Sequence, residues 1–353
     1  MITVPASFRE MPRWWHDEAG RAWLERLPAL VDAHAARWDL TLDGPTHHGS
    51  NALVVPVRQR ARAAVLRLAP PGDDVDTEAA ALRHWAGHGV VELLELDAEA
   101  GAMLLERLDA ERSLHALPPL EAAAVLGQIA RDLAIPAPGD ARSTRDIAAE
   151  EADGFAPRWS ALDEPVPARL LEAATAAAQR LAARDPGDLS VDGDLHHGQV
   201  LAGGRGDWTV VDPVLLRGDP EYDLGRVLWT RLDELPGDTE VLAALDAFVA
   251  ACGVPADRAR DWVLVRSMSY LLWGLERGLT IDPPRCRRLL ELLGRTGWRS
   301  SAQGAVSSES PRHRRADRHR GDEQEVPRTD GIDQLPGDCI AERRGDKSRG
   351  HDQ

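Results

Sequence analysis

The apolar pattern of this chain changes character near residue 110. Before that point short aliphatic stretches alternate with polar turns, and after it apolar residues recur at helical spacing. A tight polar turn separates "NALVVPVR" (51–58) from "RAAVLRLAP" (62–70), which predicts a hairpin. Two further strands, "VVELLELD" and "AMLLERLD", flank the turn "AEAG". This order predicts an α+β protein in which a small strand-rich lobe precedes a larger, mainly helical lobe.

Helices are expected before, between and after these strands. Residues 14–38 carry apolar side chains at helical spacing, and Asp76 or Thr77 is expected to cap a helix that runs through Trp85. After residue 110, recurring apolar residues predict helices at 120–134, 167–183, 257–277 and 284–294. The two lobes are therefore expected to span residues 1–109 and 110–299.

The rest of the composition indicates an ordinary cytoplasmic protein. The N-terminus has no apolar signal segment, and no run of about 18 apolar residues could span a membrane. Cys252, Cys286 and Cys339 are widely spaced, which favours neither a disulfide framework nor a zinc cluster. Residues 300–353 lack aromatic residues and apolar periodicity, so we expect a disordered tail. We expect a monomer with no membrane partner.

The net charge of the chain limits the classes of partner that it is expected to bind. The 353 residues carry a formal net charge of −16, which would repel nucleic-acid phosphates. A cationic or metal-bound partner is favoured instead, and the alternative is that the negative charge serves solubility only.

The window "VDGDLHHGQVLAGG" (191–204) places an acid and an amide five residues apart between a helix and a strand. Asp194 and Gln199 reproduce the spacing of the phosphoryl-transfer pattern Asp-x-x-x-x-Asn. An Asp on a sharp loop can accept the proton of a substrate hydroxyl, while the amide oxygen coordinates Mg²⁺ on nucleotide phosphates. Asp212 follows thirteen residues after Gln199, at the end of a strand pair, where a second carboxylate could hold the metal.

Two more acids follow Asp212 at short range and are interpreted as structural support. Asp219 precedes Pro220, which predicts a helix start with Glu221 in the first turn. Asp223 is placed to accept hydrogen bonds from the backbone of the catalytic loop.

The histidine pairs do not predict a metal site. His47–His48 and His196–His197 are adjacent in sequence, whereas two ligands on one helix face need a spacing of three or four residues. We expect His196 to shape the loop backbone and His197 to face the substrate.

Four windows together resemble a known family. "DGDLHHGQVL", "VVDPVLLRGDPEYDLG", "EAAALRHWAGHGVVELLELD" and "GAMLLERLD" are similar to the aminoglycoside/hydroxyurea antibiotic-resistance kinases. That family belongs to the aminoglycoside phosphotransferase group, and the likeness runs from about residue 15 to 297. The resemblance implies a bilobal, protein-kinase-like fold and transfer of phosphate from ATP, with Mg²⁺, to a hydroxyl of a streptomycin-like antibiotic.

The resemblance also implies roles for single residues. Asp194 corresponds to the catalytic base, Gln199 and Asp212 to the metal-binding pair, and Glu78 to the helix acid that orients the phosphate-binding side chain of the hairpin. Residues 104–108, with Glu106 and Leu108, would form the hinge for adenine. Ser50, in the turn "HHGSN", would cover the phosphates.

Two positions depart from the family pattern. Arg67 stands in "VLRL" where the family has the ATP-binding lysine of "VLKL", and Gln199 stands in place of Asn. A guanidinium is bulkier and planar, and a glutamine reaches one methylene further. A weakly active or inactive nucleotide-binding protein is therefore an alternative, as is a kinase for hydroxyurea or another small hydroxylated metabolite.

The substrate site is the least constrained by sequence. Asp233, Glu234 and Glu276, close to Trp273, could hold the cationic groups of an aminoglycoside by charge and cation–π attraction. Alternatively, these acids are solvated helix residues and Trp273 belongs to the core.

Overall fold

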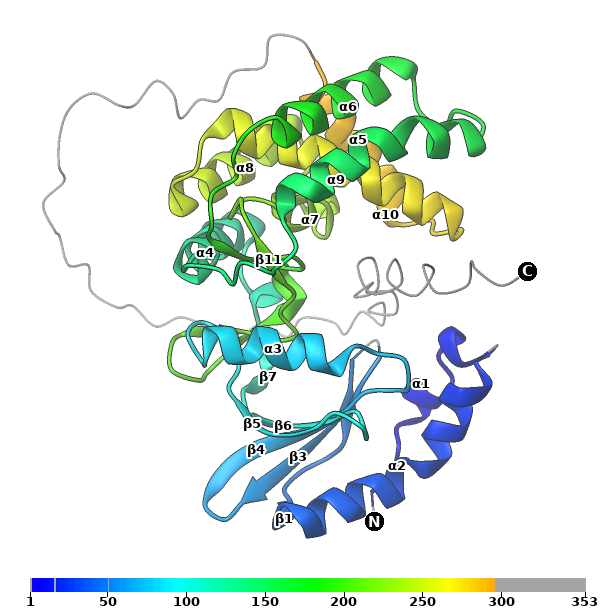
Figure 1. Ribbon diagram of the computed structural model, residues 1–353, viewed down its shortest axis with the longest axis vertical. Coiled ribbons are helices and arrows are strands. Elements are labelled where there is room, and N and C mark those ends of the chain that lie inside the picture. The colour runs from blue at the N-terminus through cyan, green and yellow to red at the C-terminus, as the bar shows by residue number, and fades with distance from the viewer. Residues whose placement is uncertain (1, 16, 50, 296–353) are drawn as a thin grey trace, which may run out of the picture.

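A twisted antiparallel sheet and a helical bundle form the two lobes of the computed structural model, which describes residues 2–15, 17–49 and 51–295 (Figure 1). The sheet has six strands in the order β1-β3-β4-β6-β5, and β2 pairs with β3. Their bounds are Leu40–Leu42 (β1), His47–His48 (β2), Leu53–Gln59 (β3), Arg62–Leu68 (β4), Leu93–Asp97 (β5) and Ala102–Glu106 (β6). The predicted hairpin and the pair of strands after it are confirmed. Ser50 and the expected tail, 300–353, lie outside the described residues.

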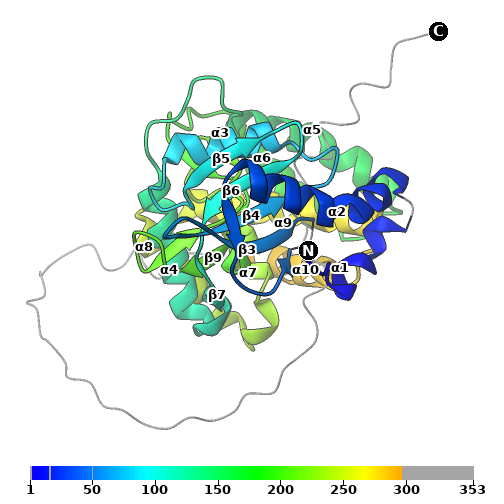
Figure 2. The ribbon, with the colours of Figure 1, turned by 90° about the horizontal axis from the view of Figure 1, so that it is seen from below.

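The two faces of this sheet pack against different parts of the chain. Helix α2 (Glu18–Arg37) follows α1 (Ala6–Arg9) and covers one face, and α3 (Val75–Trp85) lies on the face toward the helical lobe (Figures 1 and 2). Leu66 and Leu68 of β4 belong to the core beneath α2. Because successive side chains of a strand point to opposite faces, Arg67 lies on the α3 side. The sheet thus carries Arg67 toward the junction of the lobes.

The second lobe is built from helices around a long, almost fully buried helix, α9. Its helices are α4 (Pro119–Leu133), α5 (Thr144–Ala161), α6 (Ala168–Ala182), α7 (Leu224–Trp229), α8 (Asp238–Cys252), α9 (Ala256–Glu276) and α10 (Asp282–Leu293). Large side chains such as Trp262, Met268 and Leu272 of α9 fill the larger core, which also includes Trp85 and Met103 of the first lobe. The helices expected at 120–134, 167–183, 257–277 and 284–294 are confirmed. The sequence pattern does not predict α5 or α8.

Short strands at the junction of the lobes frame the expected catalytic window. They are β7 (Asp109–Ser113), β8 (Ser190–Asp192), β9 (Val200–Ala202), β10 (Trp208–Val210) and β11 (Leu215–Arg217). The strands form the sets β10-β9-β7 and β11-β8. Residues 193–199 therefore leave one small sheet and enter the other, and Asp212 lies in the connection between them.

Three expected helix starts are corrected by the structure. The first long helix begins at Glu18 because the Asp17 carboxylate accepts from Gly20 N at 2.8 Å and caps it. Asp74, rather than Asp76 or Thr77, caps α3 by accepting from Thr77 N at 3.0 Å.

The third correction concerns Asp219. The helix expected to start there begins only at Leu224, after a turn over residues 220–223. No helix of the described residues is both long and apolar enough to cross a membrane.

Candidate active site

The catalytic loop, residues 193–199, is fixed at its start by a buried carboxylate. Asp192 Oδ1 accepts from the backbone N of Asp194 at 3.1 Å and of Val214 at 3.0 Å. Gly193 N donates to Val214 O at 2.7 Å, which ties the loop to the segment before β11. Burial raises the pKa of Asp192 well above its ordinary value, and the hydrogen bond from Val214 N opposes that shift only in part.

Asp194 and Gln199 lie in direct contact at the centre of this loop. Gln199 Nε2 donates to Asp194 Oδ2 at 2.7 Å. The other oxygen, Oδ1, forms an ion pair with Arg226 Nη1. Gln199 Oε1 is buried and has no hydrogen-bond partner among the described residues. The longer side chain of glutamine therefore reaches Asp194 and still leaves an amide oxygen available.

Asp212 lies next to Gln199 through the backbone. Val211 N donates to Gln199 O at 2.8 Å, so the chain direction after β10 places Asp212 beside the loop. Asp212 has a φ of 51°, the left-handed region, which Asp tolerates better than most residues. Such conformations cluster at functional sites because the surrounding structure must hold them. The Asp212 side chain is 45% exposed, whereas that of Asp194 is 8% exposed, so solutes can reach Asp212.

Arg67 bridges two of the expected site acids. Its Nη1 lies 3.0 Å from Glu78 Oε2 and its Nε lies 3.2 Å from Asp212 Oδ1. Burial raises the pKa of Glu78 to about 8, an effect that Arg67 opposes and Asp212 strengthens. The planar fork of arginine makes both contacts at once, and a lysine ammonium has no such fork.

Asp223, the residue that precedes α7, ties the catalytic loop to helix α9. Asp223 Oδ2 accepts from Leu195 N at 3.1 Å, which is the backbone contact expected from the sequence. Asp223 Oδ1 accepts from Arg266 Nη2 of α9 at 2.8 Å. Burial raises the pKa of Asp223 to about 6, against the opposing effect of Arg266.

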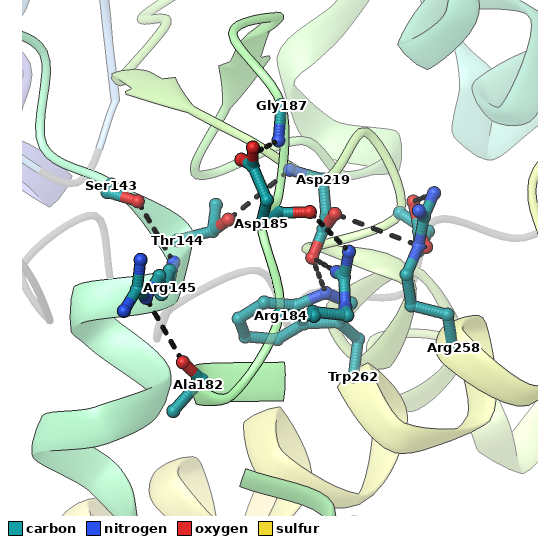
Figure 3. A network of polar contacts seen from close by, with 11 residues as sticks. Ser143, Thr144, Arg145, Ala182, Arg184, Asp185, Gly187, Asp219, Arg258 and Trp262 are labelled. Carbon is teal, nitrogen blue, oxygen red and sulfur yellow. Dashed lines mark hydrogen bonds and ion pairs between the residues drawn. The ribbon is translucent and has the colours of Figure 1, made fainter. Parts of the chain in front are cut away.

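Asp219 is the centre of a separate buried network (Figure 3). Its Oδ2 accepts from Trp262 Nε1 at 2.8 Å and pairs with Arg184, and Arg258 Nε lies 3.7 Å from Oδ1. Arg258 also pairs with the fully buried Glu221. These contacts join α9 to the segment before β8. They explain why Asp219 caps no helix: its carboxylate points into the core and away from the backbone of the following turn.

Both loop histidines are buried and uncharged. His196 Nδ1 accepts from Gly198 N at 3.1 Å, and burial lowers the pKa of His196 to about 3. His197 Nδ1 lies 3.2 Å from Thr230 Oγ1, and burial, with Arg231 adding to the effect, lowers its pKa to about 2. His196 therefore shapes the loop backbone. His197, which was expected to face the substrate, is instead buried and packs toward the end of α7. No group of three or more His, Cys, Asp or Glu residues suited to a metal occurs within the described residues.

The expected hinge residues lie where β6 leaves the sheet. Glu106 Oε1 accepts from Glu92 N at 3.3 Å, and Glu106 N donates to Glu92 O at 3.0 Å. Leu108 packs against the larger core. Of the expected phosphate-covering turn, Asn51 donates to Asp73 Oδ2 at 2.8 Å.

The residues expected to bind a cationic substrate already contact arginine side chains. Trp273 is 6% exposed, and the guanidinium of Arg277 lies 4.5 Å from its ring centroid. Glu276 accepts from Arg158 Nε at 2.8 Å. The acids Asp233 and Glu234 pair with Arg285 and Arg231 in the same way. The burial of Trp273 fits its alternative interpretation as a core residue.

Arg226 is the residue at this site that the sequence interpretation does not anticipate. One signal could have found it: Arg226 interrupts the otherwise apolar segment Leu224–Trp229 three residues after Asp223. That spacing puts both polar side chains on one face of a helix. Asp192 carries a similar signal as the first acid of "DGD".

Comparisons with known proteins identify the family of this chain. The family model "Aminoglycoside/hydroxyurea antibiotic resistance kinase" matches residues 37–278. A streptomycin 6-kinase of Streptomyces glaucescens is 38% identical over 274 residues, 75% of this chain and 89% of that protein. A hydroxyurea phosphotransferase of Kitasatospora aureofaciens is 37% identical over 303 residues, 84% of this chain and 88% of that protein.

A solved structure gives the same fold at lower identity. It is a thermostable mutant of aminoglycoside phosphotransferase APH(4)-Ia, in a ternary complex with ADP and hygromycin B. The TM-score is 0.55 at 19% identity, over 75% of this chain and 98% of that chain. The bilobal, protein-kinase-like fold is thereby confirmed, and the chain belongs to the aminoglycoside/hydroxyurea antibiotic resistance kinase family.

Proposed function

We propose that this kinase transfers the γ-phosphate of ATP, with Mg²⁺, to a hydroxyl of a streptomycin-like aminoglycoside and so confers resistance to it. One observation carries the proposal. Gln199 donates its amide N–H to Asp194 and leaves its buried amide oxygen without a partner, and the bond from Val211 N to Gln199 O ties the residue before Asp212 to the loop. We propose that these three residues supply an anionic base and two oxygen ligands for a metal.

Asp194 would accept the proton of the acceptor hydroxyl as phosphate is transferred. Its carboxylate is held on both oxygens, so it can be presented to the acceptor in one orientation. Positioning of this kind, rather than covalent chemistry, supplies most of the catalysis in phosphoryl transfer.

Gln199 Oε1 and an oxygen of Asp212 are the ligands that fit Mg²⁺. Both are oxygen donors, the first is buried and unpartnered, and the second is half-exposed. Mg²⁺ usually takes one or two protein ligands and completes its shell with phosphates and water. When bound, it neutralises charge on the transferring phosphoryl group.

Arg67 would bind the nucleotide phosphates in place of the family lysine. Glu78 holds one arm of its guanidinium, and Asp212 holds the Nε edge. The remaining donors of the fork can hydrogen-bond phosphate oxygens. We further propose that Glu106 and Leu108 line the adenine site through their backbone.

The acceptor is proposed from charge and from the relatives. A chain with a net charge of −16 attracts a cationic acceptor. Glu276 and Trp273 already bind arginine guanidinium groups, and a substrate guanidinium could use the same two contacts by replacing Arg158 and Arg277. We also propose that the protein acts as a monomer in the cytoplasm.

Hydroxyurea is the second candidate acceptor, because the relative named for it is nearly as similar as the streptomycin 6-kinase. Labelled ATP, Mg²⁺ and the full chain, incubated separately with streptomycin, with hydroxyurea and without acceptor, separate the two. We expect one labelled phosphate per streptomycin. If only hydroxyurea is labelled, hydroxyurea rather than streptomycin is the acceptor. If neither compound is labelled, the proposal is overturned. Turnover by the wild type would also exclude the inactive alternative suggested by Arg67 and Gln199.

A further inference from the structure

We propose that Arg226 is a positioning residue for phosphoryl transfer, which pins the carboxylate of Asp194 in its reactive orientation. The inference rests on the proposed function, because it takes Asp194 as the base. Its evidence is independent of the acceptor: it comes from the contacts between α7 and the catalytic loop.

The first step is the contact itself. Arg226 Nη1 pairs with Asp194 Oδ1, and the two side chains are 4% and 8% exposed. An ion pair this far from water is screened little, so it orients its partners strongly. Ion pairs of the same kind on the protein surface hardly restrict the orientation of their side chains.

The second step is the way in which α7 meets the loop. Asp223 accepts from the backbone N of Leu195, and Arg226, three residues later, pairs with the side chain of Asp194. Residues at this spacing lie on one helix face, so one turn of α7 holds two successive loop residues. Every residue of Leu224–Trp229 is buried, which leaves this face little freedom to move.

The third step is the charge around the loop. Asp192, Asp194 and Asp223 are all buried, and each is held by different donors. Asp192 takes backbone N–H groups, Asp223 takes Arg266, and Asp194 takes Arg226 and Gln199. Without Arg226, the buried carboxylate of Asp194 would keep the Gln199 amide but lose its counter-charge, and the unpaired charge would turn or draw in water.

The consequence concerns the free lone pairs of Asp194. Each carboxylate oxygen can accept two hydrogen bonds, and here each already contacts one donor, Gln199 at Oδ2 and Arg226 at Oδ1. The two donors stop rotation of the carboxylate, so the lone pair left for the acceptor hydroxyl has a fixed direction. Arg226 acts only through Asp194 in this scheme and touches neither ATP nor acceptor.

Arg226→Met tests this inference, with Arg258→Met as the matched control. Both substitutions remove a guanidinium from a buried carboxylate, but Arg258 pairs with Glu221 and Asp219, away from the loop. For Arg226→Met we expect kcat to fall by about 100-fold, since misplacement by about 1 Å has that cost. The KM values for Mg·ATP and streptomycin should stay within about threefold. Arg258→Met should lower the unfolding midpoint and leave kcat unchanged.

Two further measurements separate positioning from folding. Arg226→Lys keeps the charge and should retain part of the lost kcat, and millimolar methylguanidine should raise the kcat of Arg226→Ala. Amide hydrogen exchange over residues 193–199 should speed up in Arg226→Met and not in Arg258→Met. If the methionine variant does not fold, the lysine variant and the exchange of its loop decide the question.

Two results would overturn the inference. One is a kcat of Arg226→Met within about threefold of the wild type. The other is equal loss of kcat in Arg226→Met and Arg258→Met at equal loss of stability, because that would mark a purely structural pair. Failure of the wild type to phosphorylate any acceptor would instead refute the proposed function, and the exchange comparison would still show whether Arg226 holds the loop.

Discussion

Two buried carboxylates, Asp219 and Asp194, have similar partners and different surroundings. Asp219 binds Arg184, Arg258 and Trp262, all of which belong to the framework of the helical lobe (Figure 3). Asp194 binds Arg226 and Gln199, and Gln199 Oε1 is buried without a hydrogen-bond partner among the described residues. The Asp219 network therefore joins α9 to the segment before β8. The Asp194 network instead ends at an amide oxygen that is free to accept a ligand.

The comparison shows that an ion pair has no fixed role of its own. Forming a buried pair stabilises a fold little, because desolvation offsets the attraction, but removing one partner costs a great deal. At Asp219, that cost keeps the segment that follows α6 attached to α9. At Asp194 the same cost fixes one orientation of a base. The predictions below separate these two roles.

The largest effect is expected from Asp194→Asn. An asparagine keeps the shape of the side chain but cannot accept the hydroxyl proton, so kcat should fall by about 10³-fold. Steady-state kinetics with streptomycin measures the loss. As a control, Mg·ATP should still raise the unfolding temperature of the variant, because a ligand of the folded state stabilises it by mass action. Retention of more than a tenth of the activity would place the base elsewhere.

Asp219→Ala should separate stability from catalysis. It leaves Arg184, Arg258 and Trp262 without their shared acceptor, so the free energy of unfolding should fall by about 3–5 kcal/mol. Urea titration followed by circular dichroism measures this loss. The kcat of the folded fraction should change by less than about threefold. A fall in kcat as large as that of Asp194→Asn would show that the two networks act as one.

The smallest effect is expected from pH, through His197. The unfolded chain binds a proton on this histidine near pH 6.5, whereas the folded protein holds its pKa at about 2. Stability is therefore lost as the pH falls below 6.5, by about 2 kcal/mol for this residue between pH 7 and pH 5.

His197→Gln should remove that contribution. The raised pKa values of Asp223 and Glu78 act in the opposite direction, because the folded protein binds those protons more tightly. The measurement is therefore the difference in unfolding free energy between wild type and variant at each pH. A difference that does not change between pH 7 and pH 5 would contradict the buried, neutral state of His197.

Sequence alone determined the features that depend on near neighbours. The spacing of Asp194 and Gln199 brings them together because five residues of a tight loop return the chain on itself, and the structure has the resulting hydrogen bond at 2.7 Å. The hairpin that carries Arg67 follows from two aliphatic stretches and a polar turn. The family and its fold followed from four short windows. By contrast, α5 escapes the helical pattern because it contains Gly154 and Pro157, which disfavour a helix.

Tertiary structure alone decided the partners that come from distant segments. Arg67 meets Asp212 only where the two lobes join, and Arg226 meets Asp194 only because α7 packs under the loop. Asp219 appeared to begin a helix, yet arginines and a tryptophan from other elements draw it into the core. The physical reason is that a buried charge must find its counter-charge in three dimensions. Its partner is therefore chosen by packing and desolvation, which local spacing does not encode.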